Sequence, residues 1–279
     1  MQPLSGCRIL VVAVNIPGPV AAARLSELGA RVVKVEPPEG DPLATGAPAW
    51  YAALHARIDV VQLDLKLDAS RSRLHELLET SDLLLTSYRP SSLERLGLAW
   101  PQLEVRYPRL SQVVILGEEA PHDNRPGHDL TYQAQLGLVA PPALPRALLA
   151  DLAGAQEAVT SAVVLLLAGE RGAGRGCLTV SLLDAARRFA EPLQQGLTAA
   201  GGILGGGFPG YNVYRARDGW VALAAIEPRF VEALCREWRL AAPSSQAFEE
   251  QFRIRTADEW ERWALERDLP LVAVREVGD

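Results

Sequence analysis

Apolar segments alternate with helix-forming segments up to Leu116, and this alternation constrains the fold more than any other feature of the sequence. Residues 8–14 are rich in β-branched side chains and contain no polar residue after the arginine, which is typical of a parallel strand covered on both faces. A helical segment that ends near Gly29 leads to a second such strand at residues 31–36. Since β-α-β crossovers are right-handed, we expect the two strands to run parallel in one sheet.

The same pattern recurs further along the chain. Strands are expected at residues 60–65, 82–86 and 112–116, with helices at 71–78 and 91–96 between them. This order predicts an α/β fold with a doubly wound, Rossmann-like parallel sheet. The turn after the first strand reads Asn-Ile-Pro-Gly-Pro and lacks the Gly-x-Gly-x-x-Gly pattern that cradles a dinucleotide, so NAD binding is disfavoured.

The second part of the chain has a different pattern. Helices are expected at residues 130–136, 153–167 and 182–197. Beyond Gly206, two strands around Asp218-Gly219 indicate an antiparallel hairpin. Two helices, at residues 228–238 and 257–267, and a final strand follow. We therefore predict a large domain over residues 1–200 and a small α+β domain over residues 201–279.

Charge and cysteine content exclude several classes of protein. The 28 basic and 34 acidic residues give a net charge of −6, which disfavours nucleic acid as a partner. The three cysteines are far apart, so neither a disulfide framework nor a zinc site is indicated. No secretory signal is visible, and the longest apolar run reaches about half of the ~20 residues that a membrane span needs. We expect a cytoplasmic protein with no membrane partner.

Two short segments contain residues suited to catalysis. Asp151 stands just ahead of a long apolar helix, where a lone aspartate most often caps the helix, but a carboxylate held there is also oriented for nucleophilic attack or proton transfer. His128 lies in a polar loop that opens a helix, with Asp129 beside it and Tyr132 one turn further on. Taken alone, His128 is interpreted as a loop or capping histidine.

Blocks of sequence along nearly the whole chain resemble the family III CoA-transferases (the CaiB/BaiF superfamily), which also include the α-methylacyl-CoA racemases. The blocks occur in the family's order at residues 4–42, 60–66, 81–98, 125–138, 148–155, 174–186, 208–230 and 255–260. The resemblance implies an acyl-CoA enzyme in which two ring-like chains interlock as a homodimer and the active site lies between the large and small domains. It also implies that family members continue for several dozen residues beyond the position of Asp279.

The resemblance assigns roles to individual residues. Asp151 matches the family's essential aspartate, which is a nucleophile in the transferases and a proton donor or acceptor in the racemases. His128, Asp129 and Tyr132 resemble the racemase His-Asp-x-x-Tyr pattern, and Glu227 falls on the glutamate that would pair with the histidine. The backbone N–H groups around Asp151 would stabilise an enolate oxygen.

Coenzyme A would be part of the substrate, and no metal, flavin or nicotinamide cofactor is implied. The phosphates and adenine of coenzyme A would contact residues that match the family at strand ends and loops, namely Lys34, Lys66, Tyr88, Arg89, Arg95 and Arg125.

The sequence departs from the family at residues 54–59, where basic residues are missing, and at 117–121, where Gly-Glu-Glu-Ala-Pro replaces a Gly-Tyr-Gly loop. An apolar stretch includes Leu136, Leu138 and residues 139–144. It is consistent with a channel for the acyl chain or with a loop packed in the core.

Three functions remain open from the sequence. A racemase or epimerase would remove and replace the α-proton of a 2-methylacyl-CoA, with one proton-handling group on each face of the carbon. A CoA transferase would form an acyl anhydride on Asp151 and then an aspartyl-CoA thioester; the three glycines at 205–207 could cover that site. A diverged, non-catalytic CoA-binding subunit is the third hypothesis.

Overall fold

The computed structural model describes residues 1–276 and divides the chain into two compact units. Unit 1 is Met1–Ala190 and unit 2 begins at Glu191. The sequence placed the domain boundary near residue 200, whereas the units divide within a helix, α9 (Leu182–Gln194). The division comes at this point because Ala190 is the last residue of α9 that is buried.

Unit 1 is built on a six-stranded sheet in which every strand pairing is parallel. The strand order is β3-β2-β1-β4-β5-β6. The bounds are β1 (Arg8–Val12), β2 (Arg31–Glu36), β3 (Asp59–Gln62), β4 (Leu83–Thr86), β5 (Ser111–Leu116) and β6 (Cys177–Ser181). The predicted parallel sheet is confirmed, and the order reverses between β1 and β4, the point at which sheets of this kind bind ligands.

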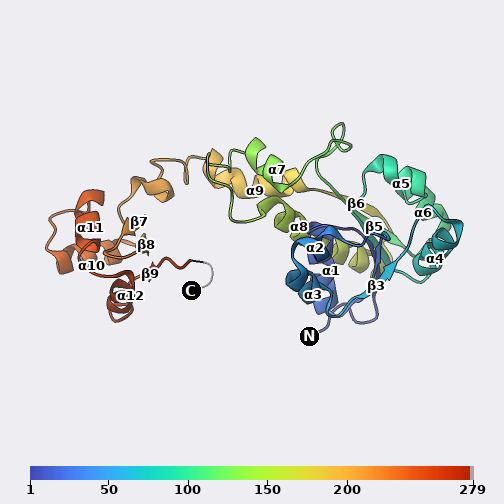
Figure 1. Cartoon of the computed structure of the whole chain (residues 1–279), viewed down its shortest axis with the longest axis horizontal. Coiled ribbons are helices and arrows are strands. Elements are labelled where there is room, and N and C mark those ends of the chain that lie inside the picture. The colour runs from blue at the N-terminus through green and yellow to red at the C-terminus, as the bar shows by residue number, and fades with distance from the viewer. Residues whose placement is uncertain (277–279) are drawn as a thin grey trace. The chain divides into compact units, whose positions relative to one another are not determined.

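Helices cover both faces of this sheet, because successive residues of each strand point to opposite sides. Ile9 and Val11 of β1 pack with α1 (Pro17–Glu27), α7 (Asp129–Gln135), α8 (Leu149–Glu170) and α9. Leu10 and Val12 pack with α4 (Asp68–Glu79), α5 (Pro90–Leu96) and α6 (Trp100–Arg106) on the other face (Figure 1). Two short helices, α2 (Pro42–Gly46) and α3 (Pro48–His55), follow β2.

Two further features of this packing concern helices α1 and α8. Gly18 lets α1 lie close to the sheet, since a Cβ there would be 2.4 Å from the Cβ of Ala13. In the described part of the chain, α8 is the one helix long and apolar enough to cross a membrane, but half of its apolar window is buried. Its contacts with α1 and β5 are those of a core helix.

Unit 2 contains a three-stranded antiparallel sheet, β7 (Tyr211–Arg215), β8 (Trp220–Ala224) and β9 (Leu271–Ala273). The predicted hairpin is confirmed, with Arg215 paired to Trp220 across the turn. The sheet packs with α10 (Pro228–Trp238), α11 (Ser245–Phe252) and α12 (Ala257–Leu265) around a core that includes five aromatic side chains, Tyr214, Phe248, Phe252, Trp260 and Trp263. A π-helical turn, η1 (Ile203–Gly207), precedes β7.

Candidate functional site

The carboxyl ends of β1, β4 and β5 surround a cavity of about 140 Å³ in unit 1, which we call the Asp151 cavity. Its apolar walls include Ile115, Leu116 and Leu182. Its polar lining residues are Asn15, Ser87, Arg89, Asp123, Arg125, His128, Tyr132 and Asp151. Asp151 and His128, which stand far apart in the sequence, therefore face one space, as the catalytic hypothesis requires.

Asp151 lies in the first turn of α8 and is largely buried at the cavity wall. Burial is the main cause that raises the pKa of this carboxyl from 3.8 to about 6, and the neighbouring Asp129 carboxylate raises it further. His128 acts in the opposite direction and lowers the pKa of Asp151. A carboxyl group with this pKa can donate or accept a proton near neutral pH.

Asp129, rather than Asp151, is the residue that caps α8. Its Oδ1 accepts hydrogen bonds from the backbone N–H of Ala150 at 2.7 Å and of Asp151 at 3.2 Å. Its Oδ2 accepts from Nε2 of Gln133 at 2.6 Å. The capping role that the sequence suggested for Asp151 is therefore wrong, because helix α8 begins at Leu149 and its free N–H groups are satisfied by a side chain from α7.

This capping arrangement also changes the assignment of the oxyanion donors. The N–H groups of Ala150 and Asp151 point at the Asp129 carboxylate, so they are not free to bind an enolate oxygen. Another donor reaches the Asp151 cavity: Tyr132 is 2% exposed, and its hydroxyl has no hydrogen-bond partner within residues 1–276.

Two glycines make room for the Tyr132 hydroxyl. A Cβ at Gly117 would lie 2.0 Å from this oxygen, and a Cβ at Gly127 would lie 2.3 Å from it. Burial is the main cause that raises the pKa of Tyr132; Glu118 and Asp151 raise it further, and Arg89 opposes them. Tyr132 therefore stays protonated and presents an O–H donor to the cavity.

His128 occupies the N-cap position of α7, so the prediction that it opens a helix is confirmed. Its backbone N–H donates to Oγ1 of Thr131 at 3.1 Å, and that hydroxyl donates back to the His128 carbonyl at 2.7 Å. The backbone is thus fixed, while the imidazole lines the cavity. Glu227 is exposed at the N-cap of α10 in unit 2, and its pairing with His128 stays a prediction.

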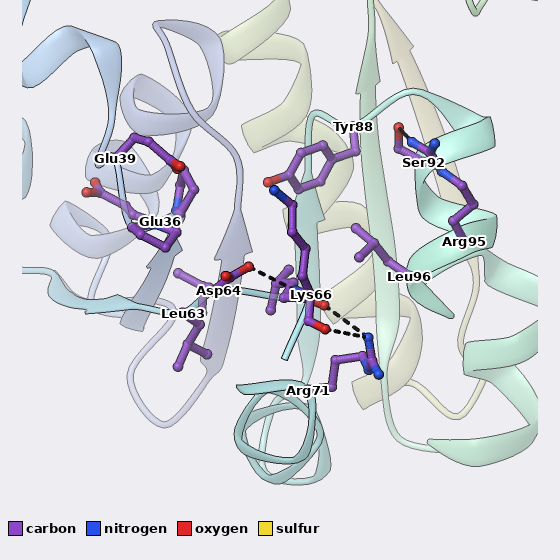
Figure 2. Close-up of a pocket in the computed structure, with 14 residues that line it drawn as sticks. Glu36, Glu39, Leu63, Asp64, Lys66, Arg71, Tyr88, Ser92, Arg95 and Leu96 are labelled. Carbon is purple, nitrogen blue, oxygen red and sulfur yellow. Dashed lines mark hydrogen bonds between the residues drawn. The ribbon is translucent and has the colours of Figure 1, made fainter. Parts of the chain in front are cut away.

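A second cavity of about 480 Å³, the Lys66 cavity, lies beyond the ends of β2 and β3. Three of the residues predicted to bind CoA line it, namely Lys66, Tyr88 and Arg95. In Figure 2 the Lys66 side chain points toward the Tyr88 ring, with Arg95 further along the wall. The lining also contains Glu36, Glu39 and Asp64, so its charge is mixed.

Arg71 lines the Lys66 cavity but was not singled out in the sequence. Its Nη1 donates to the carbonyl of Leu65 at 3.4 Å and to that of Lys66 at 3.3 Å, as the dashed lines in Figure 2 show. The available signal was its position at the start of the helix predicted at residues 71–78, the first helix after the strand at 60–65.

Lys34 does not belong to either cavity, and its predicted role in phosphate binding is wrong. The side chain is fully buried. Its Nζ contacts the Asp41 carboxylate, Oε1 of Glu36 at 2.8 Å and Nε2 of His55 at 3.0 Å. All three ammonium donors therefore have acceptors inside the protein, and none can reach a phosphate.

The loop after β4 separates the two cavities. Tyr88 lines the Lys66 cavity, whereas its neighbours Ser87 and Arg89 line the Asp151 cavity. The predicted CoA residues are thus divided: Arg89 and Arg125 lie with Asp151 rather than with Lys66.

The suggested apolar acyl channel is not found beside Asp151. Leu136 is buried in the core of unit 1 and Leu138 packs against that core. Leu144 is 72% exposed, and none of these residues lines the Asp151 cavity. Within residues 1–276, no group of three or more His, Cys, Asp and Glu side chains could hold a metal ion.

Comparison with known proteins supports an acyl-CoA enzyme. The sequence profile of CoA-transferase family III matches residues 4–279. The chain is 28% identical to a Mycobacterium tuberculosis protein named "probable fatty acyl-CoA transferase", over 84% of this chain and 68% of that protein. It is 28% identical to the alpha subunit of succinyl-CoA–L-malate CoA-transferase from Chloroflexus aurantiacus, over 99% of this chain and 75% of the subunit.

The relatives also include a racemase, and solved structures share the fold. Human alpha-methylacyl-CoA racemase is 29% identical over 84% of this chain and 64% of its own length. A crystal structure of a Mycobacterium tuberculosis hypothetical protein superposes with a TM-score of 0.86 at 23% identity, covering 99% of this chain and 86% of that one. A CaiB/BaiF family protein from Brucella suis gives a TM-score of 0.81 at 20% identity, with 99% and 85% covered.

Proposed function

Because the chain is an acyl-CoA enzyme that belongs to CoA-transferase family III, we propose that it racemises or epimerises a 2-methylacyl-CoA by moving the α-proton. One observation carries this proposal: His128 and Asp151 line the same cavity. Inversion of a carbon needs a base on one face and an acid on the other, and a CoA transferase needs only the carboxylate.

The chemistry of the two groups suits this reaction. An Asp151 carboxyl with a pKa of about 6 is present in both protonation states near neutral pH, and histidine is the side chain that most often serves as a general acid or base. One group removes the α-proton to form the enolate, and the other returns a proton to the opposite face of the carbon. The roles exchange for the reverse direction.

Tyr132 is proposed as a donor to the thioester oxygen, where negative charge develops in the enolate. The free hydroxyl in the cavity supports this role, since the N–H groups at the start of α8 already bind Asp129. The CoA nucleotide would bind in the Lys66 cavity, with its thioester past Ser87 and Arg89 in the Asp151 cavity. CoA is then part of the substrate, and the proposal needs no resident cofactor. Homodimerisation and a cytoplasmic location are proposed with it.

CoA transfer is the second candidate, supported by the relatives that carry this name. Asp151 would attack the thioester carbonyl, release CoA thiolate and form an acyl anhydride. The thiolate would attack the aspartyl carbonyl of the anhydride, release the first carboxylate and leave an aspartyl-CoA thioester. The acceptor carboxylate would attack this thioester, release the thiolate and form a second anhydride. The thiolate would then attack the acceptor's carbonyl, which gives the new acyl-CoA and restores the Asp151 carboxylate.

Proton exchange distinguishes the candidates. The protein is incubated with a 2-methylacyl-CoA in deuterated water, and label at the α-carbon is followed by mass spectrometry. We expect label with the unaltered protein and a loss of roughly 10²-fold or more in His128→Gln and Asp151→Asn. His122→Gln is the matched control, since this histidine lies in the same loop but outside the cavity lining.

Each other outcome has a definite meaning. CoA passing to an added carboxylate through a hydroxylamine-sensitive enzyme intermediate, without α-label, would refute racemisation and support transfer. If neither α-label nor CoA transfer is detected, the remaining hypothesis is a subunit that binds CoA without catalysis.

A further inference from the structure

Gln133 is a buried polar residue that takes part in no step of the proposed reaction. Its side chain is 3% exposed, on helix α7, which packs against α8. Its Nε2 donates to Oδ2 of Asp129 at 2.6 Å and to the carbonyl of Ala147 at 2.9 Å. A carboxylate and a carbonyl can only accept, so they fix the orientation of the amide, and both of its hydrogens are used.

A residue that only filled this space would not need to be polar. Burying an amide is unfavourable unless it is hydrogen-bonded, whereas an apolar side chain of the same size fills the space without that requirement. The two partners of Gln133 lie on separate segments, since Asp129 begins α7 and Ala147 precedes α8. Gln133 therefore joins the start of α7 to the segment that leads into α8.

The Asp129 carboxylate connects Gln133 to the proposed catalytic carboxyl. Its Oδ2 accepts from Gln133, while its Oδ1 accepts from the backbone N–H groups of Ala150 and Asp151. The directions of these three hydrogen bonds set the orientation of the carboxylate. Asp129 also raises the pKa of Asp151, so a rotation of its carboxylate would change both the start of α8 and the charge beside Asp151.

We propose that Gln133 is a positioning residue for Asp151, which it holds in place through the Asp129 carboxylate. With both oxygens bound, this carboxylate cannot rotate without breaking a hydrogen bond. Asp151 therefore keeps one position relative to the substrate, as catalysis requires. The inference rests on the proposed function only in taking Asp151 as the catalytic carboxyl, and it holds for racemisation and for CoA transfer alike.

Two substitutions separate positioning from packing. Gln133→Leu keeps a side chain of similar size that donates no hydrogen bond. Gln133→Glu is nearly isosteric: ionised, it places a second carboxylate against Asp129, and protonated, it can donate one O–H to it. The rate of α-proton exchange in deuterated water is measured with the full chain between pH 5 and pH 8, at saturating and at limiting 2-methylacyl-CoA and per mole of folded protein.

At pH 8 we expect both variants to exchange about 10- to 100-fold more slowly than the parent at saturation, with little change in KM. The rate relative to the parent should rise at least about fivefold from pH 8 to pH 5 in Gln133→Glu and stay constant in Gln133→Leu, because only a protonated glutamic acid restores the donor. The ratio cancels the titration of Asp129, Asp151 and His128 that all the proteins share.

The matched controls are Gln135→Glu and Gln135→Leu, because Gln135 is exposed on the same helix. Both should keep the parent rate at each pH. Parent-like exchange in Gln133→Leu would overturn the inference. A ratio for Gln133→Glu that does not rise as the pH falls would also overturn it, because a loss of packing alone does not depend on protonation of the new side chain.

The titration of the Asp151 carboxyl tests the inference without any reaction. It is followed by NMR in protein that is isotopically labelled at the aspartate carboxyl carbons, with Asp151→Asn to assign the signal. In Gln133→Leu we expect the pKa of Asp151 to fall from about 6 toward 3.8, since the Asp129 charge is no longer held beside it; an unchanged pKa would overturn the inference. A lowered pKa in a protein that shows neither α-exchange nor CoA transfer would refute the proposed function alone.

Discussion

Replacing Asp151 by asparagine is expected to stabilise the protein at neutral pH while it abolishes activity. The carboxyl is largely buried beside Asp129, and its pKa in the folded protein is about 6 against 3.8 for the ordinary group. Folding therefore favours the protonated form. The stabilising contribution of that form is complete below about pH 3.8 and is lost as the pH rises through 6.

The size of the effect follows from the two pKa values. At 1.36 kcal/mol per pKa unit, ionising Asp151 in the folded protein costs roughly 3 kcal/mol at pH 8 and about half of that at pH 5. Asparagine is nearly isosteric and uncharged at every pH, so Asp151→Asn removes this cost. For a unit of this size, the melting temperature should rise by roughly 6–12 °C at pH 8.

Differential scanning calorimetry of both proteins between pH 5 and pH 8 measures the difference. The transition to follow is that of unit 1, which contains Asp151. Glu104→Gln is the control, because Glu104 is exposed on α6 and should show no such pH-dependent gain. An Asp151→Asn protein that is less stable than the parent at pH 8, or whose gain does not grow with pH, would show that the carboxylate is favourably solvated or paired.

Three further substitutions test the packing around the site. Lys34→Met leaves the buried Asp41 and Glu36 carboxylates without their cation and should lower the free energy of unfolding by about 3–5 kcal/mol in urea titrations; a loss below 1 kcal/mol would contradict the buried network. Asp129→Ala removes the cap of α8 and should cost about 1–3 kcal/mol, with slower α-exchange; unchanged exchange would show that Asp129 does not position Asp151. Gly127→Ala places a Cβ against the Tyr132 hydroxyl and should reduce α-exchange at least as much as Tyr132→Phe does; normal exchange would exclude Tyr132 as a donor.

Local patterns were sufficient for much of the fold. The strand at 31–36 and the helix at 228–238 have the predicted bounds, since a continuous apolar run and a proline at the helix start are signals within one segment. Strand β6 was missed because it lies at the sheet edge, where Leu178 and Thr179 are exposed and no buried run forms. Helices α3 and α6 were missed although each has proline in its first turn.

The site was predicted less completely than the fold. Asp151, His128 and Tyr132 were named from the sequence, and the structure brings them to one cavity. The roles of Asp129 and Lys34 were not foreseen, because both depend on contacts between segments that are separate in the sequence. Asp129 reaches α8 from α7, and Lys34 meets its partners across β2, α2 and α3.

The sequence alone determined most of the elements and their order, since hydrophobic periodicity, proline and glycine act over a few neighbouring residues. Only the tertiary structure decided which charged groups face water, which face each other and which face a cavity. Tertiary packing places the basic residues predicted to bind CoA in three environments: a buried ion-pair network, the Lys66 cavity and the Asp151 cavity. The physical reason is that burial and distance between charges set their energies, and both arise when distant segments pack together.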